Sequence, residues 1–145
     1  MVTIRVAREK DANELADLSI QLGYDCTLET CQRLFPIIAK DPDHIILVAE
    51  SGDGVIAGYV HVFITKRLFL DPFSELGGLV VGEKFRGKGI GKILLAASEN
   101  WATEQGCAEM RVRSNVLREE AHHFYLEHAY QDVKKQRVFL KNLGS

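Results

Sequence analysis

The chain has 145 residues, of which 46% are hydrophobic and 26% are charged, and this length and composition are typical of one globular domain. Its formal net charge of -2 disfavours a nucleic-acid partner, because general nucleic-acid binders usually carry a strong basic excess. The first residues lack the apolar core of a signal peptide, and no apolar run has membrane-spanning length. We therefore expect a cytoplasmic protein without a membrane partner.

Two helices are predicted in the first third of the chain. Residues 10–22 repeat apolar side chains at helical spacing, and Gly23 is suited to end this helix because glycine readily adopts left-handed backbone angles. Thr27 is suited to cap a second helix, which Asp41-Pro42 stops because the residue before a proline avoids helical angles.

Most of the remaining chain predicts strands, which are typically short runs of β-branched and aromatic residues between turn residues. These runs occupy residues 3–7, 44–50, 55–65, 74–81 and 108–114, with a closing hairpin at Val133 and 137–143. Residues 66–73, which include Asp71-Pro72, predict a connecting loop. Gly77-Gly78 interrupts the strand 74–81, which indicates a β-bulge or the close approach of a ligand.

One stretch predicts an anion site. The strand end Leu79-Val80-Val81 leads through three alternating glycines into an amphipathic helix that runs to about Gln105. A glycine loop before a helix binds anions, because its backbone N–H groups are unpaired and the helix dipole places partial positive charge behind them. We predict that a phosphate or pyrophosphate binds the loop residues, which are Arg86, Gly87, Lys88, Gly89, Ile90, Gly91 and Lys92.

Two known types of phosphate loop fit this stretch poorly. Gly82 and Gly87-Lys88 have the spacing of a nucleotide P-loop, but Gly89 stands where the hydroxyl that binds Mg²⁺ is needed. Gly87, Gly89 and Lys92 lack the third glycine of a dinucleotide fingerprint, and the loop comes too late in the chain. Both interpretations are therefore disfavoured.

A third pattern, Arg86-x-x-Gly89-x-Gly91, resembles the pyrophosphate-binding signature of the GNAT superfamily of N-acetyltransferases. Ser114-Asn115-Val116 at a strand end and Ala121-His122-His123-Phe124-Tyr125 on a short helix also resemble this family. The resemblance covers nearly the whole chain and implies one α/β (α+β) domain over residues 1–145. We expect about four helices and a mixed, mostly antiparallel sheet of about seven strands with a central parallel pair.

The same resemblance implies that acetyl-coenzyme A is the co-substrate, bound without a metal. Leu79, Val80 and Val81 would line the cofactor, with the acetyl carbonyl near Val80, and Asn115 would hold the pantetheine arm. An ordinary turn role is the other interpretation of Asn115. The resemblance leaves the length of the acyl group open.

Acetyl transfer to an amine needs a proton acceptor, because only about one amine in 2,500 is neutral at pH 7 if its pKa is about 10.4. The resemblance implies Glu75 as this acceptor, directly or through water, because many family members carry a carboxylate on this strand just before the glycines. A solvated strand-end carboxylate is its other interpretation. Tyr125 matches the tyrosine that commonly protonates the leaving thiolate in this family, although its ring could simply pack. Backbone N–H groups beside Gly77-Gly78 could stabilise the oxyanion.

The acceptor stays open at this point: an aminoglycoside or other small amine, a polyamine, an amino-acid derivative or a protein amine. Tyr24 and Asp25, between the first two helices, are predicted substrate contacts because loops often carry binding residues. A non-catalytic acyl-coenzyme A sensor on the same fold is the alternative function, but retained Glu75 and Tyr125 favour the enzyme. Many members of the family form dimers, for which the closing strands would be the expected interface.

No metal site is predicted. Cys26, Cys31 and Cys107 lack metal-type spacing and are expected to be small reduced thiols. The last predicted helix carries His122, His123 and His128, but no two of them have the four-residue spacing of a helical metal site. Ala129 stands where the family often has glycine. If its φ is positive, about 1 kcal/mol is lost relative to glycine.

Overall fold

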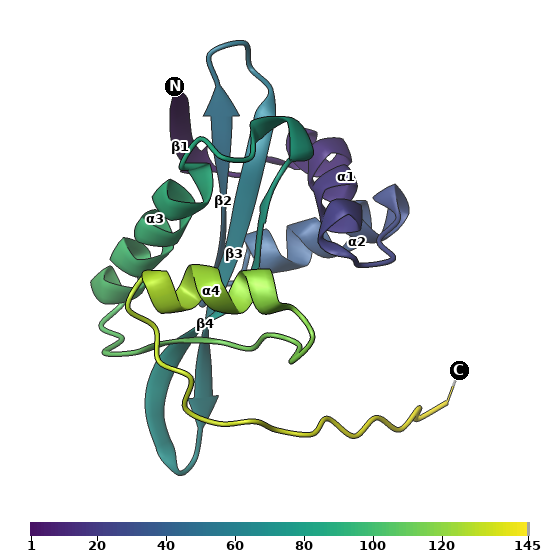
Figure 1. Cartoon of the computed structure of the whole chain (residues 1–145). Coiled ribbons are helices and arrows are strands. Elements are labelled where there is room, and N and C mark those ends of the chain that lie inside the picture. The colour runs from purple at the N-terminus through teal and green to yellow at the C-terminus, as the bar shows by residue number, and fades with distance from the viewer. Residues whose placement is uncertain (145) are drawn as a thin grey trace. The chain divides into compact units, whose positions relative to one another are not determined.

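The computed structural model (Figure 1) describes residues 1–144. These residues divide into two units between Arg113 and Ser114. The first unit contains β1 (Val2–Val6), the short 3-10 helix η1 (Glu9–Asp11), α1 (Ala12–Leu22), α2 (Leu28–Ala39), β2 (His44–Ser51), β3 (Ile56–Arg67), β4 (Leu70–Val81), the 3-10 helix η2 (Glu83–Phe85), α3 (Ile90–Glu104) and β5 (Met110–Val112). The second unit contains α4 (Glu119–Glu127).

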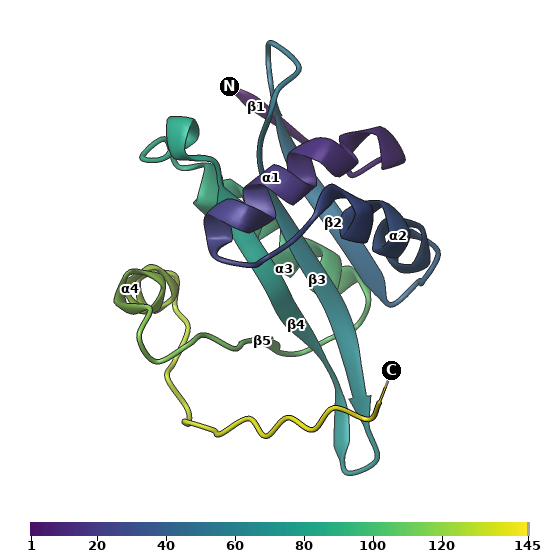
Figure 2. The same cartoon turned by 90° about the vertical axis from the view of Figure 1, so that its right-hand side faces the viewer.

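The strands of the first unit form one sheet in the order β1-β2-β3-β4-β5. Neighbours from β1 to β4 are antiparallel, and β5 runs parallel to β4. Figure 2 shows α1 and α2 on one face of this sheet and α3 on the other. The core between α1, α2 and the sheet includes Leu15, Leu18, Phe35, Val48 and Val80, and the opposite core includes the buried Leu94 and Leu95 of α3.

The predicted helix ends are confirmed. Gly23 has a φ of 110° and ends α1. The Thr27 side chain accepts a hydrogen bond from the Thr30 backbone nitrogen at 3.1 Å and thereby caps α2. In each case one residue determines the local backbone, so sequence alone was sufficient.

The prediction of about seven strands is wrong, because the sheet has five and residues 131–144 contain none. The side chains of Val138, Phe139 and Leu140 are 93%, 88% and 95% exposed. Apolar and aromatic residues form a strand only where other strands or a packed face cover them, so their local propensity was misleading. Without closing strands, β5 is the last strand, and the parallel pair lies at the edge of the sheet rather than at its centre.

The predicted loop 66–73 is also wrong, since these residues lie in the long hairpin that β3 and β4 form. The pairing slips between Thr65 and Arg67, opposite Asp71-Pro72. Proline lacks a backbone N–H group and is tolerated in a strand where the ladder is irregular. Asp71-Pro72 therefore marks an irregularity within β4, not its beginning.

Arg5 of β1 connects the sheet to the start of α1. Its guanidinium donates to the two carboxylate oxygens of Asp11 at 2.8 and 3.0 Å and to Glu50 at 3.2 and 3.4 Å. Asp11 is 2% exposed, and its hydrogen bonds with Arg5 hold the pKa of its carboxyl below its usual range. Stability that depends on this ion pair is present above the unfolded-state pKa of about 3.9 and is lost as pH falls through the folded-state pKa.

We expect Asp11→Asn to lower the free energy of unfolding by about 2 kcal/mol at pH 7, because the largely buried Arg5 guanidinium loses a charged partner. Urea unfolding at pH 7 and at pH 3 measures this effect, and the variant should lose less stability on acidification than the wild type. Asp53→Asn, in the exposed β2–β3 turn, is the control. Equal acid sensitivity of Asp11→Asn and the wild type would contradict the assignment.

Candidate active site

β4 carries a bulge at the two glycines that stand out in the sequence. His61 of β3 opposes Gly78, and Val62 opposes Leu76, so Gly77 is an extra residue in the strand. Gly77 is also exposed. The predicted bulge is confirmed, and it presents exposed backbone in the middle of the sheet.

Both glycines of the bulge turn toward side chains of β3 on the same face. A methyl group on Gly77 would lie 2.8 Å from Cε1 of Phe63, and one on Gly78 would lie 4.0 Å from the Tyr59 hydroxyl. That hydroxyl is 2.6 Å from Oγ of Ser19 in α1, which identifies the face as the one that α1 covers. Gly77 must therefore stay small for the Phe63 ring to keep its position.

Beyond the bulge, one edge of β4 has no strand partner within residues 1–144. β5 pairs with β4 only over Ser74, Glu75 and Leu76, whereas β3 continues to pair with the strand end at residues 79–81. An open strand edge offers backbone N–H and C=O groups to an extended ligand. The side chain of Val80 is buried in the core, so this residue could meet a ligand through its backbone.

The loop after β4 combines left-handed glycines with a helix N-terminus. Gly87 and Gly89 have φ values of 78° and 81°, and α3 begins at Ile90 directly after Gly89. A methyl group on either glycine would meet no atom within 4 Å, so backbone conformation rather than space requires glycine here. The N–H groups of Ile90, Gly91 and Lys92 have no acceptor within the helix, and this arrangement fits an anion.

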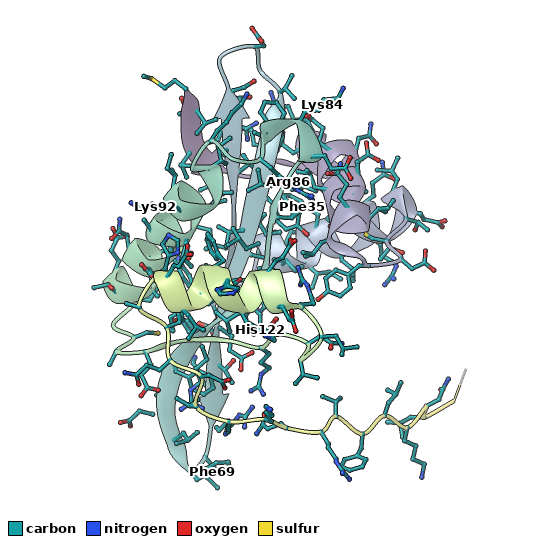
Figure 3. The ribbon with its side chains drawn as sticks, in the orientation of Figure 1. Phe35, Phe69, Lys84, Arg86, Lys92 and His122 are labelled. Atoms are coloured by element: carbon teal, nitrogen blue, oxygen red, sulfur yellow. The ribbon has the colours of Figure 1, made fainter. Side chains whose placement is uncertain are left out.

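The basic side chains of the loop are exposed and differ in their contacts. Nε of Arg86 donates to the carbonyl of Val81 at 3.2 Å, and Nζ of Lys88 lies 5.7 Å from the ring centre of Phe85. Figure 3 shows Lys92 on α3, away from Arg86. The backbone of the loop is thus fixed by its glycines and the helix start, and the basic side chains around it are exposed.

Glu75 lies two residues before the bulge, opposite Phe63 in the β3–β4 pairing. Arg113 donates to its Oε1 from Nη2 at 2.9 Å and from Nε at 3.3 Å. The side chain of Glu75 is 12% exposed. Glu75 is therefore a largely buried, ion-paired carboxylate and not a solvated residue at a strand end.

Two histidines beside the bulge were missed by sequence reasoning. Nε2 of His61 is 3.0 Å from Nδ1 of His44, and the ring of Phe63 stacks on His44 with centroids 4.9 Å apart. Nδ1 of His61 is 3.6 Å from the position that a methyl group on Gly77 would take. The sequence did hold a signal for His61: it is a titratable residue on the predicted strand 55–65. If this strand forms a hairpin with the next one, His61 can lie opposite Gly77-Gly78.

The surroundings of His61 favour a neutral ring. Burial and the neighbouring His44 lower the pKa of His61 to about 4, so its imidazole is uncharged at pH 7. Nε2 of His44 is 3.8 Å from Oδ2 of Asp41, and these side chains are 26% and 47% exposed. A row of titratable groups thus leads from the bulge to the protein surface.

In the second unit, Tyr125 lies half-buried on α4. Its ring packs edge-on against Phe124 and Tyr130, with centroid distances of 5.3 and 5.6 Å. Burial raises the pKa of Tyr125, so its hydroxyl stays protonated at neutral pH and can donate a proton. Ring packing and proton donation are therefore compatible in this residue.

Asn115 shapes the turn before α4. Its Oδ1 accepts a hydrogen bond from the Leu117 backbone nitrogen at 2.9 Å, and its backbone oxygen lies 2.9 Å from Nε2 of His122. At the other end of α4, Nδ1 of His128 is 2.7 Å from the backbone oxygen of Phe124. The turn role of Asn115 is thus observed, and its role in holding the cofactor stays a prediction.

Ala129, just after α4, has a φ of 70°. The condition stated above for a cost at this position, a positive φ, is therefore met. In this conformation the Cβ of alanine crowds the backbone, which costs about 1 kcal/mol of stability relative to glycine.

Tyr24 and Asp25 are both exposed in the connection between α1 and α2, and their predicted contact with substrate stays a prediction. In the same region, the free thiols of Cys26 and Cys31 lie with their sulfur atoms 3.4 Å apart.

Among residues 1–144, no group of three or more His, Cys, Asp or Glu side chains could hold a metal ion. No helix in this range has the length and apolar character needed to cross a membrane.

The chain resembles known proteins over nearly its whole length. Residues 12–130 match the acetyltransferase (GNAT) family. An aminoglycoside N(6')-acetyltransferase type 1 of Stenotrophomonas maltophilia is 27% identical over 141 residues, which cover 94% of this chain and 91% of the relative.

Two solved structures have the same fold. Aminoglycoside antibiotic 6'-N-acetyltransferase AAC(6')-Ih from Acinetobacter baumannii superposes with a TM-score of 0.87 at 18% identity, covering 99% of this chain and 100% of its own. AAC(6')-Iy in complex with the bisubstrate analog CoA-S-monomethyl-acetylneamine gives a TM-score of 0.86 at 21% identity, covering 98% and 99%.

Proposed function

Because the chain belongs to the acetyltransferase (GNAT) family and is an N-acetyltransferase, we propose that it moves the acetyl group of acetyl-coenzyme A to a primary amine of a small molecule. The amine attacks the thioester directly, with both substrates bound. The observation that carries this proposal is the bulged, open-edged strand β4, which leads into a glycine loop and a helix N-terminus. The match over residues 12–130 crosses the boundary between the two units, which supports one functional domain over residues 1–145.

The cofactor site in this proposal follows β4 and its loop. The diphosphate binds the N–H groups at the start of α3, where Gly87 and Gly89 leave the backbone accessible. Arg86, Lys88 and Lys92 neutralise its charge. The pantetheine arm extends along the open edge of residues 79–81, and Asn115 contributes a polar contact to it.

The reaction in this proposal uses two proton-transferring side chains. Glu75, an ion-paired carboxylate beside the bulge, attracts the cationic acceptor and takes part in its deprotonation. A backbone N–H group at the bulge stabilises the oxyanion, and Tyr125 gives its proton to the departing thiolate. A sensor that only binds acyl-coenzyme A would not need both Glu75 and Tyr125, so the enzyme is favoured.

For the acceptor, we propose an aminoglycoside. The support is the likeness to the Stenotrophomonas maltophilia relative, which is an aminoglycoside N(6')-acetyltransferase. Tyr24 and Asp25 are the proposed contacts, since an exposed aromatic ring and a carboxylate suit a sugar that carries ammonium groups.

A panel of amines, assayed with acetyl-coenzyme A by thiol release, tests this function. The panel contains aminoglycosides, polyamines, amino-acid derivatives and a lysine-rich protein, and we expect the highest kcat/KM with an aminoglycoside. Tight binding of acetyl-coenzyme A without turnover of any amine would favour the sensor. Equal calorimetric affinity for ATP–Mg²⁺ and acetyl-coenzyme A would contradict the cofactor assignment.

A further inference from the structure

His61, His44 and Asp41 form a row between the β4 bulge and the surface of the first unit. Nδ1 of His61 faces Gly77 at the bulge, and its Nε2 lies 3.0 Å from Nδ1 of His44. Nε2 of His44 lies 3.8 Å from the carboxylate of Asp41. The pairing of β2 with β3 and of β3 with β4 fixes the order of these groups.

Only one arrangement of ring protons lets His61 accept a proton from the bulge. If Nδ1 of His61 holds a lone pair, its Nε2 carries a proton and donates it to Nδ1 of His44. His44 then carries its own proton on Nε2, which points toward Asp41. In this arrangement His61 can gain a proton at one nitrogen and release another at the opposite nitrogen.

The differing environments of the two rings give the row a direction. A positive charge on the buried His61 is unfavourable, as its lowered pKa reflects. His44 lies nearer the surface, since its side chain is 26% exposed and its Nε2 faces the partly exposed carboxylate of Asp41, so a proton that reaches this ring has a path to solvent. Glu75, the other proton acceptor near the bulge, has its Oε1 engaged by Arg113.

We propose that His61 and His44 form a proton relay that carries the acceptor amine's proton from the active site to solvent, an inference that rests on the proposed N-acetyl transfer. Glu75 takes the first proton, which makes the ammonium a neutral amine, and later releases it to solvent. The neutral nitrogen then forms a bond to the thioester carbonyl carbon, and the second proton passes from nitrogen to Nδ1 of His61 while the Nε2 proton passes to His44. The C–S bond then breaks, and its electron pair stays on sulfur, which takes the proton of Tyr125. His44 releases one proton to solvent and Tyr125 regains one, so the protons balance.

Kinetics of His61→Gln test the relay, because glutamine keeps hydrogen-bonding capacity but cannot be protonated at neutral pH. We expect kcat to fall about 100-fold, with the KM for acetyl-coenzyme A within about twofold of the wild type. His44→Gln should lower kcat less, and His123→Gln, an exposed residue of α4, should have no effect. Added imidazole should restore part of the kcat of His61→Ala, which a merely structural role would not predict.

A second measurement does not depend on turnover. The ¹⁵N chemical shifts of the His61 ring at pH 7 should show a proton on Nε2 and a lone pair on Nδ1. The opposite tautomer, or a kcat of His61→Gln within twofold of the wild type, would overturn the relay alone. Failure of the wild type to acetylate any amine would instead overturn the proposed function, and the relay with it.

Discussion

Gly89→Asp should raise the dissociation constant for acetyl-coenzyme A about 100-fold, whereas Gly89→Asn should raise it only a few-fold. Both side chains tolerate left-handed angles better than other residues, which suits the φ of 81° at this position. They have nearly the same size and differ in one negative charge. The difference between the two variants therefore measures the charge of the ligand at the start of α3.

Isothermal titration calorimetry with acetyl-coenzyme A measures these constants. Gly54→Asp is a matched control, because Gly54 also has a φ of 81° and open space around it but lies in the β2–β3 turn. That variant should bind like the wild type and have similar thermal stability to Gly89→Asp. If Gly89→Asp and Gly89→Asn bind equally well, the diphosphate does not lie at this helix N-terminus.

Tyr125→Phe should lower kcat about 100-fold and change both KM values much less. The variant keeps the ring that packs against Phe124 and Tyr130 but loses the proton for the leaving thiolate. We expect an effect at the lower end of the range for general acids, because a thiolate with a conjugate-acid pKa of about 8.5 is already a fair leaving group.

Steady-state kinetics with the best acceptor of the panel measure this change. Tyr130→Phe removes a hydroxyl from the same ring cluster and is the matched control, with kcat expected near the wild-type value. A Tyr125→Phe enzyme that turns over normally would remove Tyr125 from the mechanism and leave it a packing role. An equal loss of kcat in both variants would instead indicate that the packed rings of Phe124, Tyr125 and Tyr130 act by stabilising the conformation of α4.

Sequence reasoning succeeded where neighbouring residues determine the backbone. Gly23 and Thr27 define helix ends, and Gly77-Gly78 defines the bulge, because each feature depends on local angles or on the lack of a side chain. It failed where a distant partner decides. Residues 137–143 have strand propensity but no strand partner. Residues 66–67 and 70–73 are strand because the end of β3 pairs with the start of β4 across the turn at 68–69.

The candidate site likewise has one part that local sequence predicts and one part that depends on distant residues. The glycine loop is continuous in the sequence, and its conformation follows from its own residues. The contact between His44 and His61 joins residues 17 positions apart, and the ion pair of Glu75 with Arg113 joins residues 38 positions apart. Such pairs depend on strand register, which no local pattern in this chain specifies.

The bulge also limits how this protein could be redesigned for other amines. A side chain added at Gly77 would collide with Phe63, and that ring stacks directly on His44. A substitution at the bulge intended to change selectivity would thus also disturb the proposed chemistry. The exposed connection at Tyr24 and Asp25 has no such link to the histidines, so laboratory evolution toward larger acceptors should accumulate changes there and leave Gly77 untouched.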